Sequence, residues 1–207
     1  MKRRISLIMV VLLLLAVSGT LFAQAAQEYL DAHDEAQLSD SVQSLQPEEG
    51  MLHMREEEKL ARDVYLALYE QWGIRTFAQI ARSEQRHMDA MAALLAYRQI
   101  DDPVSHAAPG EFTIPSMQKL YDELVMQGNE SPIQALTVGA MIEDLDIYDL
   151  QNLLSQTDDP VMIRVYSALL QGSEQHMRTF SRLLDRFGAP YEPSWISLEE
   201  YEAIVNR

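Results

Sequence analysis

Two similar short segments combine a glutamate with a histidine, residue types that bind transition metals in proteins. The first reads SEQRHM and places Glu84 three residues before His87, whereas the second reads SEQHM and places Glu174 two residues before His176. Three helical residues leave two side chains about 60° apart, so Glu84 and His87 can face one point. Two residues leave them about 160° apart. Either the second helix is irregular there, or only one of Glu174 and His176 binds a metal.

Two more glutamates fall inside apolar stripes with helical spacing. Glu58 shares a stripe with Met54 and Ala61, and Glu143 lies three residues after Ala140. An ionised carboxylate is costly to bury alone, by several kcal/mol, so inward glutamates are expected to be paired or to bind a cation. These four segments therefore predict a buried cluster of metal ligands, in which the six candidates are Glu58, Glu84, His87, Glu143, Glu174 and His176.

Alternatives remain for each acidic segment. Glu58 ends a run of three glutamates, and Glu143 is followed by Asp144 and Asp146, so either run also suits a solvated surface. Glu57 neighbours a second apolar stripe and is an alternative inward residue. Corresponding candidates in the two halves are roughly 85 to 90 residues apart. This common offset favours two related helical hairpins over chance.

Helices are the elements that must position these residues, because no segment shows sustained alternation of apolar and polar residues. We expect four long helices at about 47–72, 76–97, 131–156 and 160–187, with short helices at about 116–127 and after Ser197. Short connections join the first two and the last two long helices, with a long crossover between. The predicted fold class is all-α: a four-helix bundle over 47–190 with a short extra helix in its crossover, then a C-terminal tail over 191–207.

Helix starts are predicted from capping patterns. Thr76 with Gln79 three residues later predicts the start of the second long helix. Ser131, followed by proline, predicts the third start, and Asp159, also followed by proline, predicts the fourth. Ser197 predicts the start of the last short helix.

The first 25 residues read as a secretory signal peptide. Lys2, Arg3 and Arg4 precede a long apolar run, and Ala23 and Ala25 have the spacing of a cleavage site. An uncleaved membrane anchor is the alternative. Residues 26–46 are predicted to be an acidic, flexible segment. The expected localisation is therefore exported, either periplasmic or extracellular.

Composition excludes several classes of site. The net charge of −16 becomes −19 once the three basic residues of the signal are removed, since residues 1–25 contain no acid. Nucleic acids and anionic membrane surfaces need basic patches, so neither is an expected partner after signal cleavage. The chain has no cysteine, which excludes disulfides, thiolate metal sites and a lipid anchor on cysteine.

The motifs resemble the ferritin-like superfamily, and rubrerythrin-type di-iron proteins within it. EKLARDVY is similar to the first-helix pattern of that group, IARSEQRHM to the second and ALTVGAMIEDLDIYDL to the third. Residues 50–187 as a whole look like the branch called domain of unknown function 2202. The resemblance implies a dinuclear site with Glu58, Glu84, His87 and Glu143 among its ligands. The fourth helix departs from the pattern, because Ser173 stands where a glutamate ligand is expected.

The resemblance implies iron oxidation, or reduction of O2 or peroxide, at two iron ions, with manganese or zinc as alternatives. Glu84 and Glu143 would bridge the ions, Glu58 and Glu174 would be terminal ligands, and His87 and His176 would complete the set. Rubrerythrin's rubredoxin-like domain needs Cys-x-x-Cys, which is absent, so electrons would need an external donor. The alternative is a non-catalytic bundle that sequesters metal or binds a protein, and a homodimer stays open.

Overall fold

The structure is a computed structural model that describes residues 46–207. Within this range it contains six helices and no strand, which confirms the prediction of an all-helical protein. The helices are α3 (Pro47–Trp72), α4 (Arg75–Arg98), α5 (Pro115–Gly128), α6 (Pro132–Ser155), α7 (Pro160–Arg186) and α8 (Leu198–Val205). The predicted signal peptide and nearly all of the predicted acidic segment lie outside the described residues.

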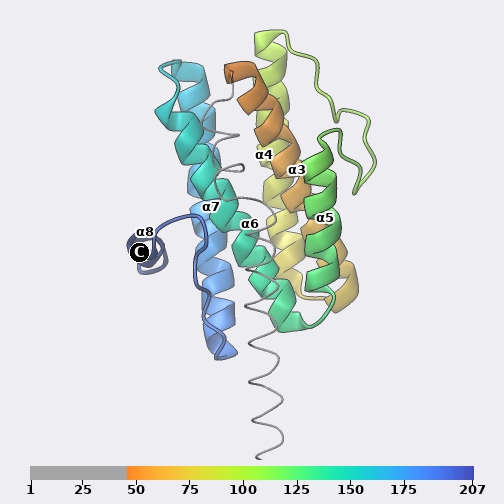
Figure 1. The fold of residues 1–207 in the computed structure, drawn as a ribbon, viewed down its shortest axis with the longest axis vertical. Coiled ribbons are helices and arrows are strands. Elements are labelled where there is room, and N and C mark those ends of the chain that lie inside the picture. Colours follow the sequence, from red (N-terminus) through yellow and green to blue (C-terminus); the bar gives the residue numbers. More distant parts are fainter. Residues whose placement is uncertain (1–45) are drawn as a thin grey trace, which may run out of the picture. The chain divides into compact units, whose positions relative to one another are not determined.

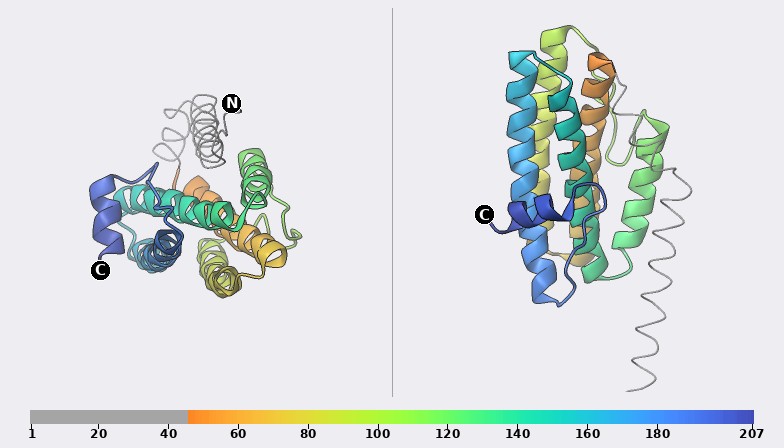
Figure 2. Two further views of the ribbon diagram at one scale, coloured as in Figure 1. Left: turned by 90° about the horizontal axis from the view of Figure 1, so that it is seen from below. Right: turned by 60° about the vertical axis from the view of Figure 1, so that its left-hand side comes forward.

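Four long helices pack side by side. α3 lies against α4, and α6 lies against α7, with each pair joined by a short connection. The pairs meet where α3 contacts α6 and α4 contacts α7. Figures 1 and 2 show the four axes running alongside one another, with α5 on the outside against α3 and α6 and the short α8 beside α7. Four helices therefore face a common interior.

Most helix starts follow their predicted caps. The side chain of Ser131 accepts a hydrogen bond from the backbone N–H of Gln134, and Asp159 accepts from Val161 and Met162. The predicted capping role of Thr76 is wrong. α4 begins one residue earlier, at Arg75, after an Ile74 whose side chain cannot accept a hydrogen bond. The two-residue turn after α3 sets this start, and Gly73 within it adopts a φ of 65°.

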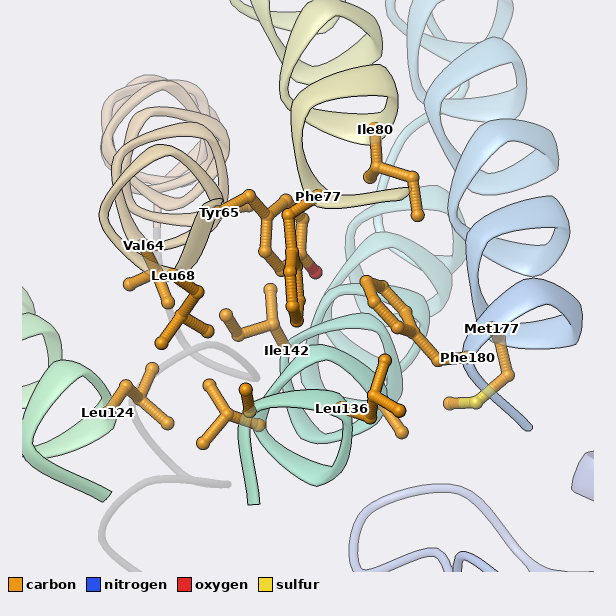
Figure 3. Packing of buried hydrophobic residues seen from close by; sticks show 14 of the residues in the cluster. Val64, Tyr65, Leu68, Phe77, Ile80, Leu124, Leu136, Ile142, Met177 and Phe180 are labelled. Carbon is orange, nitrogen blue, oxygen red and sulfur yellow. The ribbon is translucent and has the colours of Figure 1, made fainter. Parts of the chain in front are cut away.

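An aromatic cluster fills one end of the interior. The ring centroids of Tyr65, Phe77 and Phe180 lie 5.4 to 6.0 Å apart, and all three side chains are fully buried. Figure 3 shows these rings facing one another among α3, α4, α6 and α7. Gly139 on α6 leaves room for Phe180, because a Cβ at Gly139 would lie 2.5 Å from that ring. The cluster closes the interior on the side of the α3–α4 turn.

Two buried acids hold the non-helical segments in place. Glu56 accepts hydrogen bonds from the backbone N–H groups of Thr113 and Ile114, at the point where the crossover leads into α5. Asp144 accepts from the backbone of residues 194–196 and from the hydroxyl of Tyr191. The long crossover and the C-terminal segment are thus tied to α3 and α6 respectively. None of the helices in residues 46–207 combines the length and the apolar character that crossing a membrane requires.

Candidate metal centre

The carboxylate of Glu84 on α4 lies between two histidine rings from different helices. Its Oε2 atom is 2.7 Å from Nδ1 of His87, one turn along the same helix. Its Oε1 atom is 2.8 Å from Nδ1 of His176 on α7. The two imidazole rings stack with their centroids 5.7 Å apart. One glutamate therefore contacts histidines from both helical pairs.

Glu58 and Glu143 complete the cluster from α3 and α6. Oε2 of Glu58 is 3.2 Å from Nδ1 of His87, and Oε2 of Glu143 is 3.5 Å from Nδ1 of His176. The three glutamates and His176 are buried, and His87 is partly buried. We call Glu58, Glu84, His87, Glu143 and His176 the five-residue centre. The structure thus brings together five of the six residues predicted from the sequence.

Charge, rather than burial, decides the protonation of the two histidines. Burial alone would lower the pKa of His87, but the carboxylates of Glu58 and Glu84 raise it to about 11. Burial likewise opposes charge on His176, whose pKa the carboxylates of Glu143 and Glu84 raise to about 10. In the metal-free protein both rings are therefore cations at neutral pH. Their protons balance part of the carboxylate charge.

The glutamates respond to the same environment in different ways. Burial raises the pKa of Glu58 to about 7, against the opposing charge of His87. Burial also raises the pKa of Glu143, although His176 opposes it. Glu84 differs, because its hydrogen bonding and charge interactions with His176 and His87 outweigh burial and lower its pKa to about 2. Glu84 is thus the firmly ionised carboxylate at the middle of the centre.

Two neighbouring residues position the ligands. The Tyr65 hydroxyl lies 2.5 Å from Oε1 of Glu143 and donates a hydrogen bond to it, so the tyrosine of α3 orients a carboxylate of α6. Gly172 on α7 makes space for His87, because a Cβ at Gly172 would lie 2.5 Å from Cε1 of that ring and 2.6 Å from Nε2. No pattern in the sequence indicated the role of Gly172.

Asp146 is a buried carboxylate beside the centre that the sequence analysis did not select. It lies one turn after Glu143 on α6, and the Ser173 hydroxyl donates a hydrogen bond to its Oδ2 atom. Burial and the charges of Glu58 and Glu143 raise the pKa of Asp146 well above its usual value. Ser173 stands where the resemblance calls for a glutamate on α7. The structure therefore places a carboxylate beside Ser173, but this carboxylate comes from α6. In the sequence, the three-residue spacing between Glu143 and Asp146 was the pattern that could have indicated it.

Glu174 does not join the five-residue centre, which corrects the prediction that it lies there. Its Oε2 atom accepts a hydrogen bond of 3.1 Å from Arg207 and lies 3.7 Å from Nη1 of Arg178. α7 is an uninterrupted helix through this segment. The two-residue spacing therefore sends Glu174 outward when His176 points inward.

The atoms of the centre fit a pair of divalent cations. Two groups of three potential ligands have their atoms within 4.8 Å of one another: Glu58, Glu84 and His87, and Glu84, Glu143 and His176. Among the described residues, Oε1 of Glu58 is buried without a hydrogen-bond partner. Carboxylate and imidazole donors together suit iron, manganese and zinc. Glu84 alone belongs to both groups.

Comparisons with known proteins identify a family, a relative and a similar solved structure. The model of the uncharacterized protein domain DUF2202 matches residues 47–207. The uncharacterized protein MJ0754 of Methanocaldococcus jannaschii is 49% identical over 163 residues, covering 79% of this chain and 88% of the relative. The crystal structure of hypothetical protein MJ0754 from Methanococcus jannaschii DSM 2661 is similar with a TM-score of 0.76, covering 77% of this chain and 91% of that chain. The chain therefore belongs to the DUF2202 family, as its motifs predicted.

Proposed function

We propose that the five-residue centre binds two transition-metal ions, with iron the best-suited occupant, in an exported ferritin-like protein of the rubrerythrin type. The observation that carries this proposal is Glu84, whose two oxygens approach two histidines in two overlapping ligand groups. Glu84 would be a ligand shared by the two ions. Glu58 and His87 would complete one ion's protein ligands, and Glu143 and His176 the other's.

The arrangement of helices supports the ferritin-like part of the proposal. Carboxylate-bridged sites in such four-helix bundles take ligands from all four helices near the middle of the interior. Here α3 and α6 each supply one glutamate, α4 supplies Glu84 and His87, and α7 supplies His176. The place where the resemblance calls for a glutamate ligand on α7 is occupied by Ser173, which donates a hydrogen bond to Asp146. The proposed centre is therefore asymmetric.

The proposed reaction is iron oxidation or the reduction of O2 or peroxide. Two iron ions at such a site would supply the two electrons that reduction of peroxide needs. The protein's own part is to hold the carboxylates in place and to manage protons. His87 and His176 must give up their protons when cations bind, because a metal-bound nitrogen cannot carry one. Tyr65 keeps Glu143 oriented through its hydrogen bond.

A non-catalytic metal-binding or protein-binding role is the competing function. The two are separated by adding Fe(II) without oxygen to chelator-treated protein and then measuring consumption of O2 or peroxide. Our proposal expects rapid consumption by the wild-type chain and loss of it in Glu84→Ala, with Glu174→Ala as the matched control that keeps it. Binding of iron without consumption above that of free Fe(II) favours sequestration. Absence of binding overturns the proposal altogether.

A further inference from the structure

A second group of potential metal ligands lies between α3 and α6 and shares no residue with the five-residue centre. His53 and Glu57 are one turn apart on α3, and Asp149 comes from α6. Nε2 of His53 is 3.7 Å from Oε2 of Glu57 and 3.4 Å from Oδ2 of Asp149. One ligand atom from each of the three lies within 4.8 Å of the others. The three side chains therefore converge on one point.

Glu57 supplies an independent reason to expect a ligand at this point. Its side chain is only 2% exposed, and neither carboxylate oxygen has a hydrogen-bond partner among residues 46–207. Nε2 of His53 lies 3.7 Å from Oε2 of Glu57, a distance too long for a hydrogen bond. Buried polar groups in folded proteins are nearly always satisfied by a partner. A carboxylate left in this state, and aimed at a histidine and a second carboxylate, has the surroundings of a metal ligand.

Neighbouring charges make the need for a cation stronger. Asp149 and Asp146 are the carboxylates whose negative charges act most strongly on Glu57. Asp146 also leaves its Oδ1 atom unpartnered within the described part of the chain. The charge of Asp146 acts on Glu57 and the charge of Glu58 acts on Asp146, so these buried acids form an electrostatically connected line. A cation near His53 would reduce the repulsion along this line.

We propose that His53, Glu57 and Asp149 bind one divalent cation, of the manganese, iron or zinc class, in a site separate from the five-residue centre. One imidazole and two carboxylates form a mixed donor set that suits these metals. Three protein ligands also leave coordination positions for water. The His53 side chain is 21% exposed, so the site can be reached from solvent. The aromatic cluster, by contrast, closes the interior beyond the five-residue centre.

The test counts Zn²⁺ ions bound to the chelator-treated full chain after equilibrium dialysis. His53→Ala and Glu57→Gln should each lose one ion per chain relative to wild type, or bind it at least about tenfold more weakly. Two matched controls should retain it: His106→Ala, an exposed histidine, and Glu70→Gln, an exposed glutamate of α3. Unchanged stoichiometry and affinity in His53→Ala overturn the proposal, because that partly exposed side chain can be removed without loss of the fold.

Two further arms separate this site from the five-residue centre. Glu84→Gln should lose the ions of the five-residue centre and keep the ion at His53, so failure of either site leaves the other measurable. Thermal melting tests folding directly. In chelator, Glu57→Gln should melt no lower than wild type, because it removes an unpaired buried charge. Added Zn²⁺ should then raise its melting temperature less than that of Glu70→Gln, and an equal rise would count against the site.

Discussion

Oε1 of Glu84 lies 2.8 Å from Nδ1 of His176, so a carboxylate of the first helical pair meets an imidazole of the second. The contact joins α4 to α7 at the middle of a buried group of charges. In the metal-free protein it is held by a proton on the imidazole, whose pKa is raised to about 10 by Glu143 and Glu84 despite burial. A bound cation would take the place of that proton. Stability, pH and metal content are therefore linked in this protein.

The metal-free protein should lose stability as the pH rises above 6.5. The pKa values of His87 and His176, about 11 and about 10, exceed the ordinary histidine value of 6.5. A histidine whose pKa is raised by folding stabilises the folded protein fully at pH values below its pKa in the unfolded chain. This stabilisation is lost as the pH rises toward and through its pKa in the folded protein. The free energy of unfolding should therefore fall between pH 6.5 and about 10, by on the order of 1 kcal/mol per pH unit for each histidine. Thermal melting in chelator across this range measures it.

Glu58 acts in the same direction at lower pH, because its pKa is raised from 4.5 to about 7 and its ionisation over that range disfavours the fold. Glu84, with its pKa lowered to about 2, loses its stabilising effect only as the pH falls below 4.5. Bound Mn²⁺ should reverse the trend, because metal binding needs deprotonated ligands. A chelated protein that becomes more stable between pH 6.5 and 10 would contradict the protonated, carboxylate-paired histidines described above.

Gly172→Ala should reduce metal binding by displacing His87. The added Cβ would lie 2.5 Å from the His87 ring, which has to shift from its present position against Glu84. We expect metal affinity to fall at least about tenfold, as it does when the orientation of a ligand is disturbed. Gly128→Ala is the matched control, because a Cβ at Gly128 on α5 would lie at the same distance from the Leu68 side chain of α3. Each variant should lose about 1–3 kcal/mol of stability, and equal metal affinity in both would contradict the positioning role.

Ser173→Ala should destabilise the metal-free protein. The Ser173 hydroxyl donates to Oδ2 of Asp146, whose other oxygen has no partner among the described residues. Loss of the hydroxyl leaves a buried carboxyl with neither oxygen bonded, at a cost of about 1–3 kcal/mol. Ser155→Ala serves as the control, because that exposed hydroxyl bonds only the Asn152 carbonyl and its loss should cost less than about 0.5 kcal/mol. Urea unfolding in chelator measures both, and equal stabilities would refute the role of Ser173.

The contrast between Glu143 and Glu174 shows how far spacing alone carries a site prediction. Glu143 falls in an apolar stripe, and the stripe correctly places it inside. Glu174 stands two residues from His176, and the spacing itself indicates that a regular helix cannot turn both inward. The repeated SEQ-(R)-HM segment favoured equivalent ligands in the two halves of the chain. The regular geometry of α7 instead turns Glu174 away from the centre, where it pairs with Arg207. That arginine lies at the end of the chain, which no local pattern reveals.

The acidic runs show what sequence periodicity could not assign. Glu56, Glu57 and Glu58 are consecutive and all buried, although a run of charges usually marks a solvated face. Glu58 follows the apolar stripe and was predicted. Glu56 is buried because the crossover folds over it and bonds its carboxylate, and Asp144 is buried because the C-terminal segment does the same. Non-helical segments far along the chain supply these partners, so helical periodicity carries no information about them.

Glu174→Ala should leave metal binding intact. The side chain faces Arg178 and Arg207 at the surface and contacts none of the five-residue centre. Loss of an exposed ion pair should change the free energy of unfolding by less than about 1 kcal/mol. Glu143→Ala is the comparison, because it removes a carboxylate 3.5 Å from His176. Loss of a bound ion in Glu174→Ala, measured by metal analysis after dialysis, would place Glu174 at the site after all.

The number of ions lost on Glu84→Gln tests the central claim most directly. Chelator-treated wild-type and variant chains are loaded with Fe(II) without oxygen, desalted and analysed for iron per folded chain. Because Glu84 belongs to both ligand groups, the variant should lose two ions per chain, whereas Glu174→Ala should lose none. Equal iron content in wild type and Glu84→Gln would contradict a metal centre built on Glu84.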